Sequence, residues 1–81
     1  MNEYNTIVTL QDYGKIKIKL NEVIQAKRIT RNKLATLTNV RFEVIDHLYS
    51  GNLERLDLDI MARICFVLEC KVSDILEFVK E

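Results

Sequence analysis

Proline and tryptophan are absent from this 81-residue chain, and glycine occurs only at Gly14 and Gly51. Because proline and glycine interrupt regular elements and mark turns, their scarcity favours helices with brief links over a loop-rich fold. A chain of this length forms one domain, which buries only about 60% of its unfolded surface. The apolar fraction of 48% and the charged fraction of 30% are typical of a soluble globular protein.

Long hydrophobic segments are also missing. No apolar run approaches the roughly 20 residues that a membrane-spanning helix needs. The first ten residues contain neither a basic region nor an apolar segment of signal-peptide length. We therefore expect a cytoplasmic protein with no membrane partner.

The residues that commonly build catalytic or metal sites are few. Cys65 and Cys70 are five positions apart, which fits neither a redox C-x-x-C motif nor a zinc-ligand spacing. Cys65 falls in an apolar helical stripe, where a thiol acts as a small hydrophobe, so we expect buried or idle thiols. The chain has no glycine-rich phosphate loop or paired-carboxylate site, and its single histidine lies on a different predicted element from the cysteines. No enzymatic activity, cofactor or metal is expected.

Net charge is zero, but the two halves of the chain differ in sign. Between residues 15 and 41 there are eight basic residues and one acid, whereas from residue 42 onward there are four basic residues and nine acids. A positive half can attract a phosphate backbone even when the total charge does not. The alternative is ordinary solvated charge on both halves.

The N-terminal segment, residues 1–14, is polar and has one alternating patch at residues 6–10. Residues 15–19 alternate strictly between lysine and isoleucine, which predicts a strand with one apolar face. The two patches could pair as a hairpin across the turn-like residues 12–14. The other interpretation is that residues 1–12 are frayed. The globular domain is therefore predicted to cover residues 15–81.

Apolar residues at helical spacing predict an all-α domain of five short helices. The helices are expected at about residues 20–27, 31–38 and 41–50, after Asp57, and after Ser73. Thr30, Asp57 and Ser73 are the predicted N-caps, since their side-chain oxygens can accept backbone N–H groups that have no partner inside the helix. The residues expected to face inward from the final helix are Ile75, Leu76 and Val79.

Residues 30–51 have the layout of two short helices joined by one tight turn. The small or apolar residues that could pack these helices at a steep angle are Leu34, Ala35, Val40, Ile45 and Leu48. Asn39 lies where the chain must turn, and asparagine tolerates a left-handed backbone. The second helix keeps an outward face of Glu43, Asp46, His47 and Ser50. This is the pattern of a helix-turn-helix, whose second helix enters the DNA major groove.

The sequence resembles the phage Cro/CI-type, or lambda-repressor-like, helix-turn-helix family (XRE family), in particular its small single-domain regulators. The likeness covers roughly residues 15–79. It is carried within the motif by Thr30, Leu34, Ala35, Asn39, Val40, Ile45, Leu48, Tyr49 and Gly51, and beyond it by residues 55–59 and 70–77. The resemblance implies a five-helix DNA-binding domain that usually works as a homodimer, to which the lysine–isoleucine alternation adds a short N-terminal β segment.

The resemblance also assigns roles to particular positions. The base-reading positions fall on Phe42, Glu43 and His47. The phosphate-contacting positions fall on Arg31, Arg41 and Asn52. Arg31 replaces the glutamine that is common at its position, Asn39 replaces the usual turn glycine, and Asn52 and Glu54 stand where many relatives carry lysine.

The chemistry of these side chains permits readout, because histidine can donate to guanine, phenylalanine can contact a thymine methyl and glutamate can accept from cytosine N4. Each residue also has an alternative role. Phe42 could be a hydrophobic staple, and Glu43 could pair with His47 on a solvated face. Asp46 is interpreted as a spacer, and Arg31 and Arg41 could be plain surface charge.

Two functions follow as hypotheses. The first is a transcriptional regulator that binds a pseudo-palindromic operator in double-stranded DNA as a homodimer. The second is a protein-interaction module of antitoxin or adaptor type, suggested by the acidic second half and by the acids on the recognition face.

Overall fold

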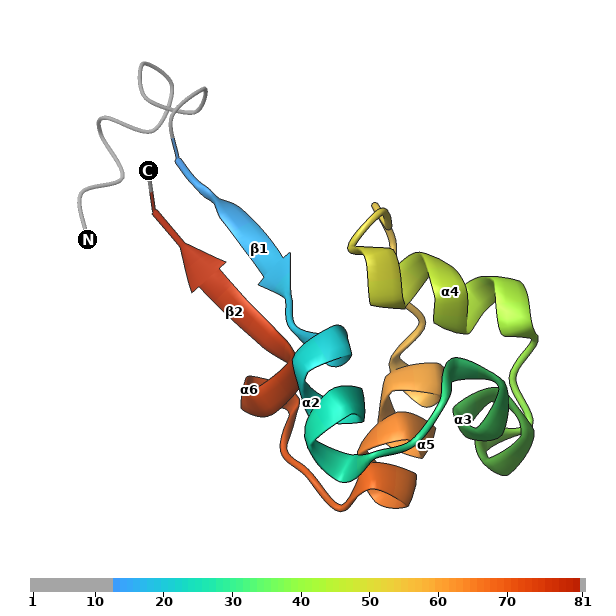
Figure 1. Cartoon of the computed structure of the whole chain (residues 1–81). Coiled ribbons are helices and arrows are strands. Elements are labelled where there is room, and N and C mark those ends of the chain that lie inside the picture. Colours follow the sequence, from blue (N-terminus) through green and yellow to red (C-terminus); the bar gives the residue numbers. More distant parts are fainter. Residues whose placement is uncertain (1–12, 81) are drawn as a thin grey trace.

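The computed structural model describes residues 13–80 and consists of five short helices and one two-stranded ribbon (Figure 1). In chain order the elements are β1 (Lys15–Ile18), α2 (Leu20–Lys27), α3 (Arg31–Thr38), α4 (Phe42–Ser50), α5 (Leu58–Leu68), α6 (Val72–Ile75) and β2 (Leu76–Val79). The helices confirm the expected fold class. The ribbon projects from the helical body beside α2 and α6, while α4 lies on another side of the body.

One hydrophobic core joins all five helices. Its buried members are Leu20, Ile24, Leu34, Ala35, Ile45, Leu48, Met61, Ile64, Leu68 and Ile75. Four of the five residues expected to pack the two motif helices are among them, and the fifth, Val40, is half-buried against the same core. Each fully buried Leu or Ile contributes about 1.5–3 kcal/mol relative to an exposed one, so the core fixes the positions of α3 and α4.

The N-caps of α3 and α5 agree with the sequence. The Thr30 hydroxyl accepts the Lys33 N–H at 3.0 Å. The Asp57 carboxylate accepts the N–H groups of Asp59 at 2.8 Å and Ile60 at 3.2 Å. Both side chains thus satisfy amides in the first helical turn, where no backbone carbonyl is available.

The structure of residues 71–79 differs from the sequence prediction in two respects. Lys71, and not Ser73, is the N-cap residue of the last helix, and its backbone N–H donates to the Asp74 carboxylate at 2.8 Å. The helix has only four residues, and Leu76 and Val79 belong to the strand β2 instead of facing inward from a helix. The run Leu-Glu-Phe-Val becomes a strand because β1 offers it a pairing edge and because aromatic and β-branched residues suit a pleated surface.

The strand predicted at residues 15–19 is confirmed at Lys15–Ile18, and it pairs antiparallel with β2. The hairpin partner considered for it, residues 6–10, lies outside the described residues. In the observed register Ile18 faces Leu76 near the core, whereas Ile16 faces Phe78 farther out. Ile16 and Phe78 are each 58% exposed, so the outer half of the ribbon carries an uncovered apolar pair.

Gly14 marks the start of this ribbon. Its φ of +108° lies in a region that residues with a Cβ rarely adopt, and a Cβ placed there would lie 2.4 Å from the Val79 carbonyl oxygen. Glycine is therefore required for the close approach of the two chain segments.

Candidate nucleic-acid interface

The turn between α3 and α4 is held in one conformation. Asn39 ends α3 with a left-handed φ of 56°, as the sequence predicted, and the next amide, Val40 N–H, donates to the Ala35 carbonyl at 3.1 Å. Because Asn39 is left-handed, the N–H groups of Asn39 and Val40 can donate to carbonyls at the end of α3 that have no partner within the helix. The same conformation turns the chain toward α4. The buried Thr38 hydroxyl donates to the Leu34 carbonyl at 2.7 Å, so the last turn of α3 has no unpaired side-chain donor.

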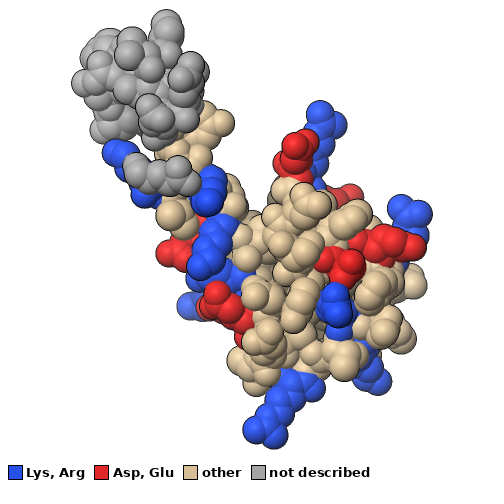
Figure 2. Space-filling view, turned by 45° about the horizontal axis from the view of Figure 1, so that its top comes forward, with Lys and Arg blue, Asp and Glu red and all other residues tan. Residues whose placement is uncertain are grey.

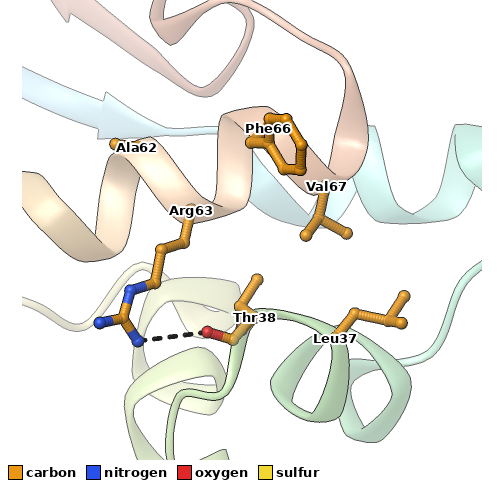
Figure 3. A pocket seen from close by; sticks show the side chains of 6 residues that line it. All are labelled: Leu37, Thr38, Ala62, Arg63, Phe66 and Val67. Atoms are coloured by element: carbon orange, nitrogen blue, oxygen red, sulfur yellow. Dashed lines mark hydrogen bonds between the residues drawn. The ribbon is translucent and has the colours of Figure 1, made fainter.

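Arg63 of α5 ties this turn to the body of the domain (Figure 3). Its Nη1 donates to the carbonyl oxygens of Thr38 and Asn39, each at 3.3 Å, while its Nη2 lies 2.9 Å from an Asp59 carboxylate oxygen. Asp59 is one helical turn before Arg63 and holds the guanidinium in place. The angle between α3 and α4 is thus supported from outside the motif by a residue that sequence reasoning did not single out.

The outward face of α4 is open to solvent. Glu43, His47 and Ser50 are exposed, and Phe42 is 38% exposed at the start of the helix. Among the residues that the structure describes, no hydrogen bond or ion pair joins Glu43 to His47. The three predicted base-reading residues, Phe42, Glu43 and His47, therefore lie on one short helix whose opposite side, with Ile45 and Leu48, is buried.

Arg31, at the start of α3, reaches across to α4. Its Nη1 lies 2.6 Å from an Asp46 carboxylate oxygen, and its guanidinium carbon lies 4.6 Å from the centre of the Tyr49 ring and 6.0 Å from that of Phe42. Gln25 of α2 donates to the Tyr49 hydroxyl at 3.2 Å. Three helices thus position one guanidinium, and Asp46 gains a partner within the protein.

This Arg31 cluster is partly exposed, with 44% of the Arg31 and 40% of the Asp46 side chain accessible. Solvent screening limits such a pair to about 0.2–1 kcal/mol of stability. Its larger effect is geometric, because the carboxylate and the ring restrict the orientations of a long side chain. Sequence reasoning missed Gln25, and it named Tyr49 only as part of the resemblance. The available signal was that Asp46 and Tyr49 are three residues apart on one helix.

The two other predicted phosphate-contacting residues lie at opposite ends of α4. Arg41 is its N-cap residue and is exposed, and its side chain makes no capping bond. Asn52 follows Gly51, which ends the helix with φ of +76°, and the Asn52 N–H donates to the His47 carbonyl at 3.0 Å. The structure therefore places these two polar side chains on either side of the exposed α4 face and Arg31 beside it.

Charge is distributed in separate groups over the surface. On the side drawn in Figure 2, lysines and arginines gather along the ribbon, while the helical body carries separate basic and acidic groups. Within residues 13–80, histidine, cysteine, aspartate and glutamate do not form a group of three that could hold a metal ion. No helix of this part of the chain has the length and hydropathy needed to cross a membrane.

Comparisons with known proteins agree with this geometry. The family model described as a Cro/C1-type HTH DNA-binding domain matches residues 19–81. Among solved structures, the crystal structure of transcriptional regulator VanUg, form II, superposes with a TM-score of 0.65 at 21% sequence identity, covering 84% of this chain and 91% of that one. Comparison with curated proteins gave no significant match.

Proposed function

The chain belongs to the Cro/C1-type helix-turn-helix DNA-binding family, and from this premise we propose that it is a sequence-specific transcriptional regulator acting in the cytoplasm by binding and not by catalysis. Its α4 helix enters the major groove of double-stranded DNA. Two copies bind a pseudo-palindromic operator, with their recognition helices roughly 34–36 Å apart along the duplex.

The observation that carries the proposal is the exposed face of α4, which a fixed turn and a buried opposite side hold in place. His47 can donate to guanine O6 or N7, Glu43 can accept from cytosine N4, and Phe42 can pack on a thymine methyl. An α-helix presenting such groups fits the major groove, which is about 12 Å wide.

The backbone contacts come from Arg31, Arg41 and Asn52. An arginine has five N–H donors in a planar fork, and Asp46 engages Nη1 of Arg31. The guanidinium therefore keeps donors for a phosphate oxygen while Asp46 and Tyr49 hold it beside α4. Arg41 and Asn52 would contact phosphates beyond the two ends of the same helix.

The proposed homodimer is supported by the uncovered apolar pair on the ribbon. Ile16 and Phe78 face each other across the two strands and are both more than half exposed. An exposed strand edge with an apolar face is a surface on which another chain can pack. Covering them with a second copy would bury this surface and supply the two-fold symmetry that a palindromic site requires.

Binding to a random-sequence duplex, measured by fluorescence anisotropy from about 50 to 200 mM salt, tests the DNA-binding role. We expect affinity to fall steeply with salt, and the Arg31→Ala variant to flatten the slope of log K against log salt by about one unit. Lys33→Ala serves as the matched control, since Lys33 lies on the same helical turn outside the Arg31 cluster. Failure to bind any duplex at 50 mM salt would refute the proposal.

The Glu43→Gln variant tests whether Glu43 reads a base or only repels the phosphate backbone. If Glu43 accepts from cytosine N4, the variant should shift the selected base toward adenine, which glutamine contacts in bidentate fashion. If the carboxylate only repels phosphate, the variant should bind every sequence slightly more tightly with the same selected site. Parallel selection from a random duplex pool distinguishes the two results.

The second candidate is a protein-interaction module, and a specific surface favours it. An apolar hollow of about 320 Å³ lies between α3 and α5, lined by Leu37, Ala62, Phe66 and Val67 among others, with Phe66 84% exposed (Figure 3). The acidic recognition face gives it less support, because Asp46 is already paired with Arg31. This candidate would be favoured if the protein bound no DNA duplex, or bound duplexes with an affinity that did not change with salt concentration.

A further inference from the structure

One stripe of α4 lies beside the exposed face that is proposed to read bases. Phe42, Asp46 and Tyr49 follow one another along this stripe at helical spacing. Arg31 lies along the stripe, with its Nη1 2.6 Å from an Asp46 carboxylate oxygen and its guanidinium carbon 4.6 Å from the centre of the Tyr49 ring. A helix in the major groove has a sugar–phosphate backbone on each flank, so the stripe and Arg31 would lie along one of these backbones.

Tyr49 has an anchored ring and a hydroxyl group at the surface. The residue is half-buried, and its ring packs against the hydrophobic core. Its hydroxyl oxygen accepts the Nε2–H of Gln25, an exposed residue of α2, at 3.2 Å. A tyrosine whose ring is packed in this way presents its polar end at a fixed place. The position of the Tyr49 hydroxyl is therefore set by contacts within the protein, before any DNA is bound.

The hydrogen bond from Gln25 leaves the proton of the Tyr49 hydroxyl available. A phenolic hydroxyl can accept a hydrogen bond through its oxygen and donate its own proton at the same time. Gln25 uses the oxygen, and within residues 13–80 no protein group accepts the proton. Because hydrogen bonds in a chain polarise one another, accepting from Gln25 makes the Tyr49 O–H a stronger donor. A charged acceptor beside Arg31 would complete this chain.

We propose that Tyr49 donates its hydroxyl proton to a phosphate oxygen of the DNA backbone, beside the phosphate contact of Arg31, and that Gln25 positions this hydroxyl. The inference rests on the proposed DNA-binding function and adds two residues to its backbone contacts. Hydrogen bonds to phosphate oxygens fix the register of a protein on the duplex and carry no sequence information directly. Tyr49 would therefore raise the affinity for every duplex and leave the choice of sequence to the exposed face of α4.

The Tyr49→Phe variant tests the hydroxyl contact, because it keeps the ring and removes only the donor. Binding to a random-sequence duplex is measured by fluorescence anisotropy from about 50 to 200 mM salt. We expect affinity to fall by about tenfold at each salt concentration, with an unchanged slope of log K against log salt, since a neutral donor neutralises no phosphate charge. Tyr13→Phe is the matched control. Tyr13 is 62% exposed just before β1, and its variant should bind as the parent does.

A double-mutant cycle tests the positioning role of Gln25. Gln25→Leu should weaken duplex binding by about threefold when Tyr49 is present. It should cause no further loss in the Tyr49→Phe background, because a positioning residue acts only through the group that it positions. Circular dichroism and urea unfolding of each variant verify that the helices and the unfolding midpoint stay close to those of the parent. A merely structural role for Gln25 would move the midpoint and would not depend on the Tyr49 hydroxyl.

Parental affinity of Tyr49→Phe would overturn this inference and leave the proposed DNA-binding function in place. A salt slope flattened by about one unit, as expected for Arg31→Ala, would also overturn it, because the hydroxyl would then act only by holding Arg31. Equal losses from Gln25→Leu with and without the Tyr49 hydroxyl would refute the positioning role. A parent that binds no duplex at about 50 mM salt would overturn the proposed function, and this inference with it.

Discussion

The helix-turn-helix unit and the β ribbon are built in different ways. In α3–α4 the inward side chains are almost fully buried, the turn is fixed by a left-handed Asn39, and Arg63 anchors it from α5. The ribbon is held by a four-residue ladder, by Lys19 N–H donating to the Ile75 carbonyl at 2.6 Å, and by a Lys19–Glu77 ion pair at 3.6 Å, and its outer apolar pair is uncovered. The difference indicates that the domain keeps the helix that would read DNA rigid and leaves the ribbon dependent on further contacts.

The largest effect is expected from breaking the rigid unit. Leu34→Ala removes a fully buried side chain between α3 and its neighbours and should lower the free energy of unfolding by about 2–5 kcal/mol. Ile16→Ala, on the exposed half of the ribbon, should cost the monomer less than about 1 kcal/mol. Urea unfolding at low protein concentration measures both. Equal losses would contradict the distinction between the two regions.

A substitution at Gly14 should destabilise the ribbon without destabilising the helices. Gly14→Ala combines an unfavourable φ with a clash against the Val79 carbonyl and should cost about 1–3 kcal/mol, lost mainly from ribbon stability. Amide exchange at Glu77, which stands opposite Lys17 at a hydrogen-bonded position of the ladder, should accelerate while exchange at Ile45 stays slow. The control is Gly51→Ala, where a Cβ would meet nothing within 4 Å. It should cost about 1–2 kcal/mol for the left-handed backbone and leave ribbon exchange unchanged.

A smaller loss should follow removal of the α5 cap. Asp57→Ala deletes the acceptor of two amide N–H groups and should lower the free energy of unfolding by about 1 kcal/mol. Ser73→Ala is the matched control, because Ser73 lies inside the short α6 and is not its N-cap. Thermal unfolding of both variants should show a shift for the first and almost none for the second. A larger shift for Ser73→Ala would restore the sequence-based assignment.

The smallest change in stability is expected at the turn between α3 and α4. Asn39→Gly relieves the left-handed backbone while retaining the carbonyl that Arg63 contacts, and it should raise the free energy of unfolding by about 0.5 kcal/mol. The gain is limited because glycine also increases the entropy of the unfolded chain. Chemical denaturation detects a change of this size, and a loss of stability would show that the Asn39 side chain stabilises the turn.

The accuracy of sequence reasoning differed between these regions for a physical reason. The caps at Thr30 and Asp57 and the turn at Asn39 depend on residues within a few positions, so local patterns were enough to predict them. The strand β2 depends on a pairing edge some 60 residues earlier in the chain, which periodicity cannot reveal. Residues 76–79 therefore fit a helical pattern in the sequence, although they form a strand beside β1 in the structure. The N-cap at Lys71 is a local feature, a backbone N–H that donates to Asp74, and it was missed because Ser73 is the more usual type of N-cap residue.

The candidate site also combines features set by nearby residues with features set by residues far apart in the sequence. The exposure of Glu43 and His47 follows from helical periodicity and could be predicted. The ion pair between Arg31 and Asp46 could not be predicted, because it depends on the crossing of α3 and α4. Asp46, interpreted from the sequence as a spacer, holds Arg31 in position.

In the proposed complex the α4 face reads bases while the arginines contact the phosphate backbone. Site selection from a random duplex pool, carried out in parallel on the parent and on His47→Ala, tests it most directly. We expect His47→Ala to lose preference at one base position in each half-site, to weaken binding to the parental site by about 1–3 kcal/mol, and to keep the parental affinity for random duplex. The same selected sequence from both proteins would contradict base reading by His47.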